Sequence, residues 1–227
     1  EMCIRDRVTG TWGKYTSDDF SKIRDTKIIE VKQDEIENYV QNPWKIDDIE
    51  FLHVTSNETI NGIQLREFNK INHDSLIIDM SSDIGSYSFE WDNLAYIYAG
   101  AQKNMGIPGV SICIGDEQYL NTENNSKYLN LGQLVEKNSL LNTPPTFSIY
   151  ILKLVTDWMI QMGGVKYFEE KSIRQSSRLY EQLNSYEDSL ILPVCDYSKS
   201  RSNIIFKFEN NELEKKFHIE AGKKGII

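Results

Sequence analysis

The sequence contains few cysteines and no long apolar run. Only three of its 227 residues are cysteine (Cys3, Cys113 and Cys195), and their spacing fits neither a disulfide framework nor a zinc site. No stretch is long and apolar enough to span a bilayer, and no signal-peptide pattern is present. These absences argue against a secreted or membrane protein and favour a reducing, cytoplasmic setting.

Positive charge is also scarce. The 25 Lys and Arg residues are outnumbered by 34 Asp and Glu residues, which gives a formal net charge of −9, and the basic residues are scattered. This distribution argues against a nucleic-acid-binding surface. Acidic enzymes still bind anionic substrates through local groups, so an enzyme of that kind is not excluded. The three histidines, His53, His73 and His218, are not spaced as a metal-ligand set, and we predict no metal site.

Neither end of the chain has the pattern expected of a complete protein. The chain starts at Glu1 rather than Met, and it stops at Ile227, where a strand should be starting. The first seven residues, EMCIRDR, share no pattern with the residues that follow, and we interpret residues 1–7 as a candidate foreign leader. We therefore expect a fragment that lacks both ends.

Short apolar runs separated by polar connections predict the secondary structure. We expect strands at 27–31, 49–54, 76–80, 95–98 and 110–114, a helix around 17–25, a long helix opened by Asn142-Thr-Pro-Pro-Thr, and a second long helix at 165–185. Continuous apolar strands are typical of sheets that are covered on both faces. From Ser202 onward, a strand ("NIIFKF") and a helix ("NELEKKFHIEA") indicate a second domain. The pattern predicts an α/β fold, with a mainly parallel sheet flanked by helices in a partial large domain (1–168) and part of a smaller α+β domain (169–227).

Three polar residues, Thr59, Asp79 and Lys103, lie just past the ends of apolar strands. In open α/β sheets, ligands bind outside the carboxyl ends of the strands. Asp79 and Lys103 could form a structural ion pair, because lysine is rarely buried unless it is paired. They could instead belong to a pyridoxal-phosphate site, which needs a lysine for the Schiff base and an acidic partner for the pyridinium nitrogen. In that site, partial desolvation would lower the lysine pKa and make its amine nucleophilic.

The segment "YIYAGAQKNMGIPG" (96–109) resembles the cofactor-lysine segment of the phosphoserine aminotransferases, a class-V, fold-type I family that uses pyridoxal 5'-phosphate. Five other segments resemble the same family in the same order: "TGTW", "HVTSNETINGIQ", "IIDMSSDIGS", "NTPPTFSIYI" and "GGVKYFEEK". Together they cover nearly the whole chain from Val8 onward. The combination of "AGAQKN" with "NTPPTF" is highly specific.

The resemblance implies a role for each of these residues. Lys103 is expected to form the Schiff base and to move the proton between the substrate α-carbon and the cofactor, while Asp79 keeps the pyridine nitrogen protonated. Trp12 is expected to stack on the cofactor ring, and Thr59 and Gln102 to hydrogen-bond its substituents. Without the resemblance, Trp12 is interpreted as a packing residue and Thr59 as an ordinary turn residue.

Asn142 and Thr143 precede the first long helix. Side-chain and backbone donors at a helix start form an anion site, and the resemblance implies that this pair reaches the cofactor phosphate of a partner subunit. It therefore implies a homodimer with shared active sites. A plain helix cap would explain the pair equally well.

The resemblance also implies a reaction. It predicts transfer of an amino group between L-glutamate and 3-phosphohydroxypyruvate, which gives O-phospho-L-serine and 2-oxoglutarate in serine biosynthesis. The segments that hold the family's substrate arginines are not part of this sequence. Two alternatives stay open: another class-V pyridoxal-phosphate enzyme, or a catalytically inert α/β fragment or binding module built on the same sheet.

Overall fold

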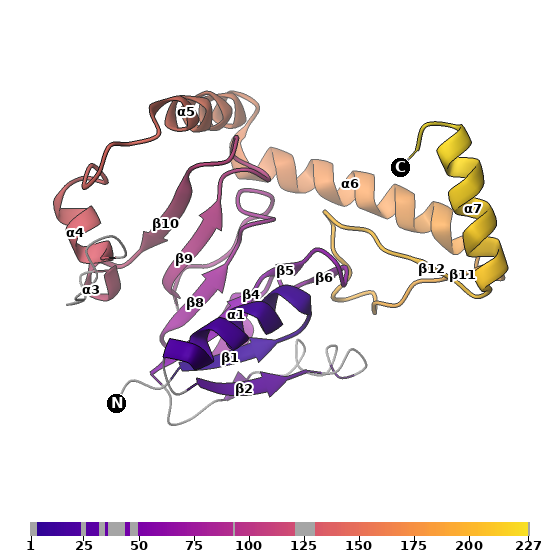
Figure 1. The fold of residues 1–227 in the computed structure, drawn as a ribbon, viewed down its shortest axis with the longest axis horizontal. Helices are drawn as coiled ribbons and strands as arrows, with labels where there is room; N and C mark the ends of the chain where they lie inside the picture. The colour runs from indigo at the N-terminus through magenta and orange to yellow at the C-terminus, as the bar shows by residue number, and fades with distance from the viewer. Residues whose placement is uncertain are drawn as a thin grey trace.

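A computed structural model describes residues 4–23, 26–31, 35, 44–45, 50–92, 94–120 and 130–226 of the chain. A central six-stranded sheet is flanked by helices, and a long helix leads from it to the C-terminal part (Figure 1). The strands are β1 (Ile4–Val8), β2 (Thr26–Glu30), β3 (Trp44–Lys45), β4 (Phe51–Thr55), β5 (Asn57–Glu58), β6 (Ile63–Gln64), β7 (Ile71–Asn72), β8 (Leu76–Asp79), β9 (Leu94–Gly100), β10 (Ser111–Gly115), β11 (Leu190–Ile191) and β12 (Lys207–Phe208). The helices are α1 (Thr11–Ile23), α3 (Glu117–Leu120), α4 (Leu131–Glu136), α5 (Thr146–Gln161), α6 (Gly164–Asn184) and α7 (Asn211–Lys223), with a short 3-10 turn at Phe68–Lys70.

The central sheet has the strand order β10-β9-β8-β4-β1-β2. Four of its neighbouring pairs are parallel, and only β9 and β10 run antiparallel. The predicted α/β fold with a mainly parallel sheet is therefore confirmed. Smaller pairings join β3 to β7, β5 to β6 and β11 to β12.

The two faces of the sheet carry different side chains, because successive residues of a strand point to opposite sides. On one face, helix α1 packs against β1 and β4, and the Phe20 ring meets the His53 ring edge-on at 5.2 Å. The other face is formed by apolar side chains such as Val54, Ile78 and Ile97, which belong to the main hydrophobic core. Burial of these β-branched residues explains why β4 and β8 form in the middle of the sheet.

Strand β10 departs from the expected pattern. Continuous apolar runs predicted strands covered on both faces, but Ser111, Cys113 and Ile114 are exposed. β10 lies at the edge of the sheet, where it is joined only to β9 (Figure 1). Within the described part of the chain, the strands covered on both faces are thus those in the interior of the sheet.

Helix α1 begins earlier than predicted. It starts at Thr11 rather than near Ser17, so Trp12 lies in the first helical turn and not in a loop. The reason is a contact distant in sequence: the two carboxylate oxygens of Glu58 accept hydrogen bonds from the backbone N–H groups of Trp12 and Gly13, each at 2.8 Å. Helix starts need partners for their free N–H groups, and here the partner comes from another strand.

Helix α5 also begins differently from the prediction. It starts at Thr146, its N-cap residue is Pro145, and no side chain caps it. Asn142 lies four residues before the helix, so the predicted capping role of Asn142 is wrong. The backbone N–H of Thr146 instead bonds to the carbonyl of Pro144 at 2.8 Å. The two prolines and this turn start the helix without a side-chain cap.

The C-terminal part is reached through α6, which runs continuously over Gly164–Asn184 (Figure 1). The strand predicted at 203–208 is shortened to Lys207–Phe208, because the residues before it dock on the sheet domain: Ile205 packs against the hydrophobic core there. The division at 168/169 stays a prediction. Within the described residues, no helix combines the length and the apolarity needed to cross a membrane.

Residues 4–7, which we interpreted as part of a leader, lie in strand β1 between β2 and β4. Asp6 and Arg7 are buried there, and Asp6 Oδ1 lies 2.9 Å from His53 Nδ1. Three charged side chains in a row are unusual in an interior strand, since charge is costly to bury. The foreign origin of these residues stays a prediction.

Candidate active site

A polar cavity of about 200 Å³ opens at the carboxyl edge of β4, β8 and β9. Nine residues line it: Trp12, Thr55, Asn57, Thr59, Asp79, Ser81, Ser82, Gln102 and Lys103. The predicted residues Trp12, Thr59, Asp79, Gln102 and Lys103 are all in this set. The register of β4, β8 and β9 explains why these residues lie close together. Thr55, Asp79 and Tyr98 are Cα partners on these parallel strands, whose carboxyl ends share one edge of the sheet.

Asp79 is held by the turn that follows its strand. The backbone N–H of Ser81 donates to Asp79 Oδ1 at 2.9 Å, and the Ser56 hydroxyl donates to the Asp79 carbonyl at 2.8 Å. Gly100 N–H in turn donates to the Ser81 hydroxyl at 3.3 Å. These bonds link the carboxylate to the end of β9, the strand that leads to Lys103.

Lys103 follows β9 in a tight turn. Two backbone bonds close this turn, from Ala101 N–H to the Val110 carbonyl at 3.0 Å and from Met105 N–H to the Ala101 carbonyl at 2.9 Å. The lysine side chain is exposed, and its Nζ lies 5.5 Å from the centroid of the Trp12 ring. Within the described part of the chain, Lys103 makes no ion pair with Asp79. The amine therefore stands at the cavity without a carboxylate partner there.

Trp12 is fixed through both its backbone and its side chain. Its indole Nε1 donates to Thr59 Oγ1 at 2.8 Å, while its backbone N–H is held by Glu58. Burial raises the pKa of the Glu58 carboxyl, and the bonds from Gly13 and Trp12 oppose that rise. The β5–β6 hairpin thus positions Trp12, and the N-terminus of α1 already has a protein carboxylate as its anion.

Gln102 precedes Lys103 and is exposed at the cavity. Its side chain folds back over Gly100, where an added Cβ would lie only 2.5 Å from Gln102 Oε1. A side chain at position 100 would therefore displace the flexible end of Gln102 from this position.

Asn142 and Thr143 are exposed and are not among the described residues that line the cavity. Their predicted contact is with a partner subunit, so their position in a single chain leaves that prediction open.

The cavity contains one buried polar atom in need of a partner. Thr55 is only 4% exposed, and its Oγ1 has no hydrogen-bond partner among the described residues. Buried hydroxyls are normally paired. Together with the Asp79 carboxylate, the Lys103 amine and the Trp12 ring, this hydroxyl fits a planar ligand that carries several polar groups and a basic nitrogen.

Sequence reasoning missed several residues of this cavity, including Thr55, Asn57 and the Glu58 that supports it. A signal was available, because polar residues crowd directly behind two apolar strands in "HVTSNETI" and "DMSS". Adjacent polar residues at the carboxyl ends of strands are candidates for one site.

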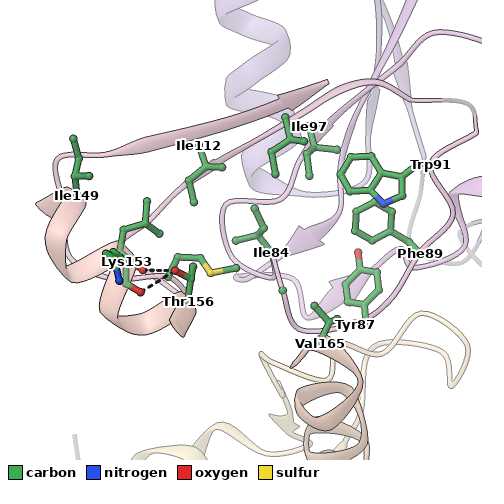
Figure 2. Close-up of a pocket in the computed structure, with 14 residues that line it drawn as sticks. Ile84, Tyr87, Phe89, Trp91, Ile97, Ile112, Ile149, Lys153, Thr156 and Val165 are labelled. Carbon is green, nitrogen blue, oxygen red and sulfur yellow. Dashed lines mark hydrogen bonds between the residues drawn. The ribbon is translucent and has the colours of Figure 1, made fainter. Parts of the chain in front are cut away.

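A larger cavity of about 540 Å³ lies on the face of the sheet that carries Ile97 and Ile112 (Figure 2). Tyr87, Phe89 and Trp91 form one side, and α5 forms the other. Lys153 is the one charged residue among the described residues that line it, and its amine is bonded to Asp157. Because it combines no reactive amine with a carboxylate in its lining, we do not regard this cavity as the active site.

Comparison with known proteins identifies the family. The sequence pattern described as aminotransferase class-V matches residues 19–226. The chain belongs to the class-V aminotransferase family. It is 36% identical over 229 residues to the phosphoserine aminotransferase of Geobacillus kaustophilus, an alignment that covers 97% of this chain and 62% of that protein.

Solved structures of this family have the same fold. Phosphoserine aminotransferase from Bacillus circulans subsp. alkalophilus superimposes with a TM-score of 0.89 at 32% identity, covering 99% of this chain and 63% of that one. A second phosphoserine aminotransferase structure, from a study of radiation damage to the Schiff base, superimposes with a TM-score of 0.85 at 31% identity. This match covers 99% of the present chain and 64% of the other. The chain thus spans less than two thirds of the length of these relatives.

Proposed function

We propose that this chain carries the cofactor site of a phosphoserine aminotransferase that uses pyridoxal 5'-phosphate. The observation that carries the proposal is the cavity itself, in which a lysine amine, a carboxylate, an indole and six further polar side chains meet at the carboxyl edge of the sheet. The similarity to phosphoserine aminotransferases supports the substrates: L-glutamate and 3-phosphohydroxypyruvate, converted to 2-oxoglutarate and O-phospho-L-serine.

When bound, pyridoxal phosphate supplies an electron sink for the pair released at the substrate α-carbon. Asp79 would hold a proton at the pyridine nitrogen, and Trp12 would pack against the ring. Thr59 and Gln102 would hydrogen-bond the ring substituents, and Thr55 Oγ1 would offer a further polar contact. The Lys103 amine would hold the cofactor covalently and, once the substrate amine has displaced it, would be free to move the proton at the α-carbon.

The proposal includes a homodimer with shared sites. Asn142 and Thr143 are exposed ahead of α5 and away from the cavity of their own chain. Helix α5, which follows them, presents exposed apolar side chains such as Phe147 (68% exposed) near its start and Ile160 (72% exposed) near its end. In the proposed dimer, Asn142 and Thr143 would hold the cofactor phosphate of the partner subunit. The proposal also includes a cytoplasmic location and a role in serine biosynthesis.

The decisive experiment is to map the covalent attachment of the cofactor in the full-length protein that carries this chain. Borohydride reduction followed by peptide mapping should place pyridoxal phosphate on Lys103, and Lys103→Ala should abolish both attachment and transamination. Lys14→Ala is a matched control, since Lys14 is an exposed lysine two residues from Trp12. Attachment to another lysine would reject the assignment.

A further inference from the structure

The C-terminal segment Ser198–Asn203 lies directly against the hairpin that forms one wall of the cavity. Backbone bonds run from Gln64 N–H to the Ser198 carbonyl at 2.8 Å and from Ser200 N–H to the Gly62 carbonyl at 2.9 Å. Ser198 and Ser200 are completely buried. A segment more than 130 residues away in sequence is therefore built into the structure around the β5–β6 hairpin.

Asn57 connects this segment to the cavity. It lines the cavity and is only 2% exposed. Its Nδ2 donates to Ser82 Oγ at 2.8 Å and to Asn203 Oδ1 at 2.9 Å, while its Oδ1 accepts from the Ser200 hydroxyl at 2.7 Å. Both amide protons and the amide oxygen are used. Because a buried amide is costly to leave unpaired, each of these partners constrains Asn57.

Ser200 organises the other side of the contact. Its hydroxyl oxygen accepts the backbone N–H of Ser202 at 3.1 Å and that of Asn203 at 2.9 Å while it donates to Asn57. The hydroxyl therefore sets the turn that brings Asn203 within reach of the same amide. Neither Ser200 nor Asn203 is among the described residues that line the cavity.

The residues that follow Asn57 hold Trp12. Glu58 binds the backbone N–H groups of Trp12 and Gly13, and Thr59 binds the indole. A short path thus leads from the C-terminal segment through Asn57 to the residue proposed to cover the cofactor ring. Each step is a hydrogen bond between described residues or a bond of the chain.

We propose that Asn57 is a positioning residue through which the Ser200–Asn203 segment holds the cavity wall, so that release of this segment loosens the cofactor site. The proposal rests on the proposed function for the identity of the ligand, pyridoxal phosphate. It assigns a role to a contact between the sheet domain and the C-terminal part. It also predicts that movement of the C-terminal part changes how firmly Trp12 is held.

Variants outside the cavity test the proposal in the full-length protein. Ser200→Ala and Asn203→Ala each remove a partner of Asn57, and each should raise the dissociation constant for pyridoxal phosphate by about 5- to 10-fold, as expected for one lost buried hydrogen bond. Tyr180→Phe is the matched control. It removes the 2.9 Å bond from the Tyr180 hydroxyl to the Ser200 carbonyl, which anchors the same residue to α6 without touching Asn57. This control should change the dissociation constant by less than about 2-fold.

Hydrogen exchange provides a readout that does not need the cofactor. Ser200→Ala should speed exchange of the backbone amides of Trp12 and Gly13 in the apo protein, and Tyr180→Phe should not. Equal effects of all three variants on both readouts would overturn the proposal, since a purely structural role predicts that. If Ser200→Ala fails to fold, Asn203→Ser takes its place with the same expected result. If Ser200→Ala speeds exchange at Trp12 and Gly13 but the wild-type protein binds no pyridoxal phosphate, the result would support the contact and reject the proposed function.

Discussion

The indole Nε1 of Trp12 donates a 2.8 Å hydrogen bond to Thr59 Oγ1, although the two residues lie 47 positions apart. Trp12 is in the first turn of α1, and Thr59 follows β5. The bond fixes the plane of a ring that is 40% exposed and that faces the Lys103 amine. An aromatic side chain at an open cavity would otherwise sample several rotamers.

Loss of this bond should weaken cofactor binding. Thr59→Val keeps the shape of the side chain and removes the acceptor, so the dissociation constant for pyridoxal phosphate should rise by about 5-fold or more. Thr59→Ser keeps the hydroxyl and should bind within about 2-fold of the wild type. An absorbance titration of the apo protein measures both. Unchanged binding by the valine variant would show that the bond does not position the ring for the cofactor.

Stability should depend on pH through Asp83. This carboxyl is completely buried, and burial raises its pKa to about 6, although bonds from Ser56 and Gln64 oppose the rise. The folded state then holds the proton more tightly than the unfolded state. The free energy of unfolding should therefore fall as pH rises between about 4 and 6, by roughly 3 kcal/mol at most from this group.

The measurement is denaturant unfolding of the wild type and of Asp83→Asn at several pH values. The variant cannot ionise at this position, so its free energy of unfolding should change less steeply between about pH 4 and 6. This expectation holds even if the substitution itself makes the protein more or less stable than the wild type. Glu58 contributes a slope of the same sign in both proteins, because burial raises its pKa too. Parallel curves for the two proteins would show that Asp83 does not titrate in this range.

The sequence predicted that Asp79 and Lys103 meet at one edge of the sheet, because both residues follow the strands that hold them. Asp79 and Lys103 each stand at the end of an apolar run, and parallel strands bring such ends to one edge. The start of α1 could not be predicted, because its cap is Glu58 on a distant hairpin. The hydrogen bond between Asn203 and Asn57 could not be predicted either. The pattern of "NIIFKF" does not indicate which of its residues pair as a strand and which contact the β5–β6 hairpin.

Mixed dimers test the proposed role of Asn142 and Thr143. In a dimer formed from one Lys103→Ala subunit and one Asn142→Ala/Thr143→Ala subunit, a shared arrangement puts both defects in one site and leaves the other intact. Two inactive proteins, when mixed and reassociated, should then recover up to about a quarter of wild-type activity, because roughly half of the dimers are mixed. No recovery despite proven subunit exchange would mean that each site is built from one chain.

Asp79→Asn separates a role at the cofactor from a role in strand structure. The substitution keeps the size of the side chain and an acceptor for the Ser81 N–H, and it removes the negative charge. A carboxylate that holds the pyridine nitrogen protonated stabilises the charge that develops as the α-proton leaves, and removing such a preorganised partner commonly costs ~10² or more in rate. The variant should therefore bind pyridoxal phosphate and lose single-turnover rate with phosphoserine by at least that factor. If Asp79 only fixed the end of β8, the variant would instead show a lower melting temperature with nearly normal turnover in the molecules that stay folded. A cofactor titration, a thermal melt and a single-turnover measurement on the same preparation distinguish the two roles.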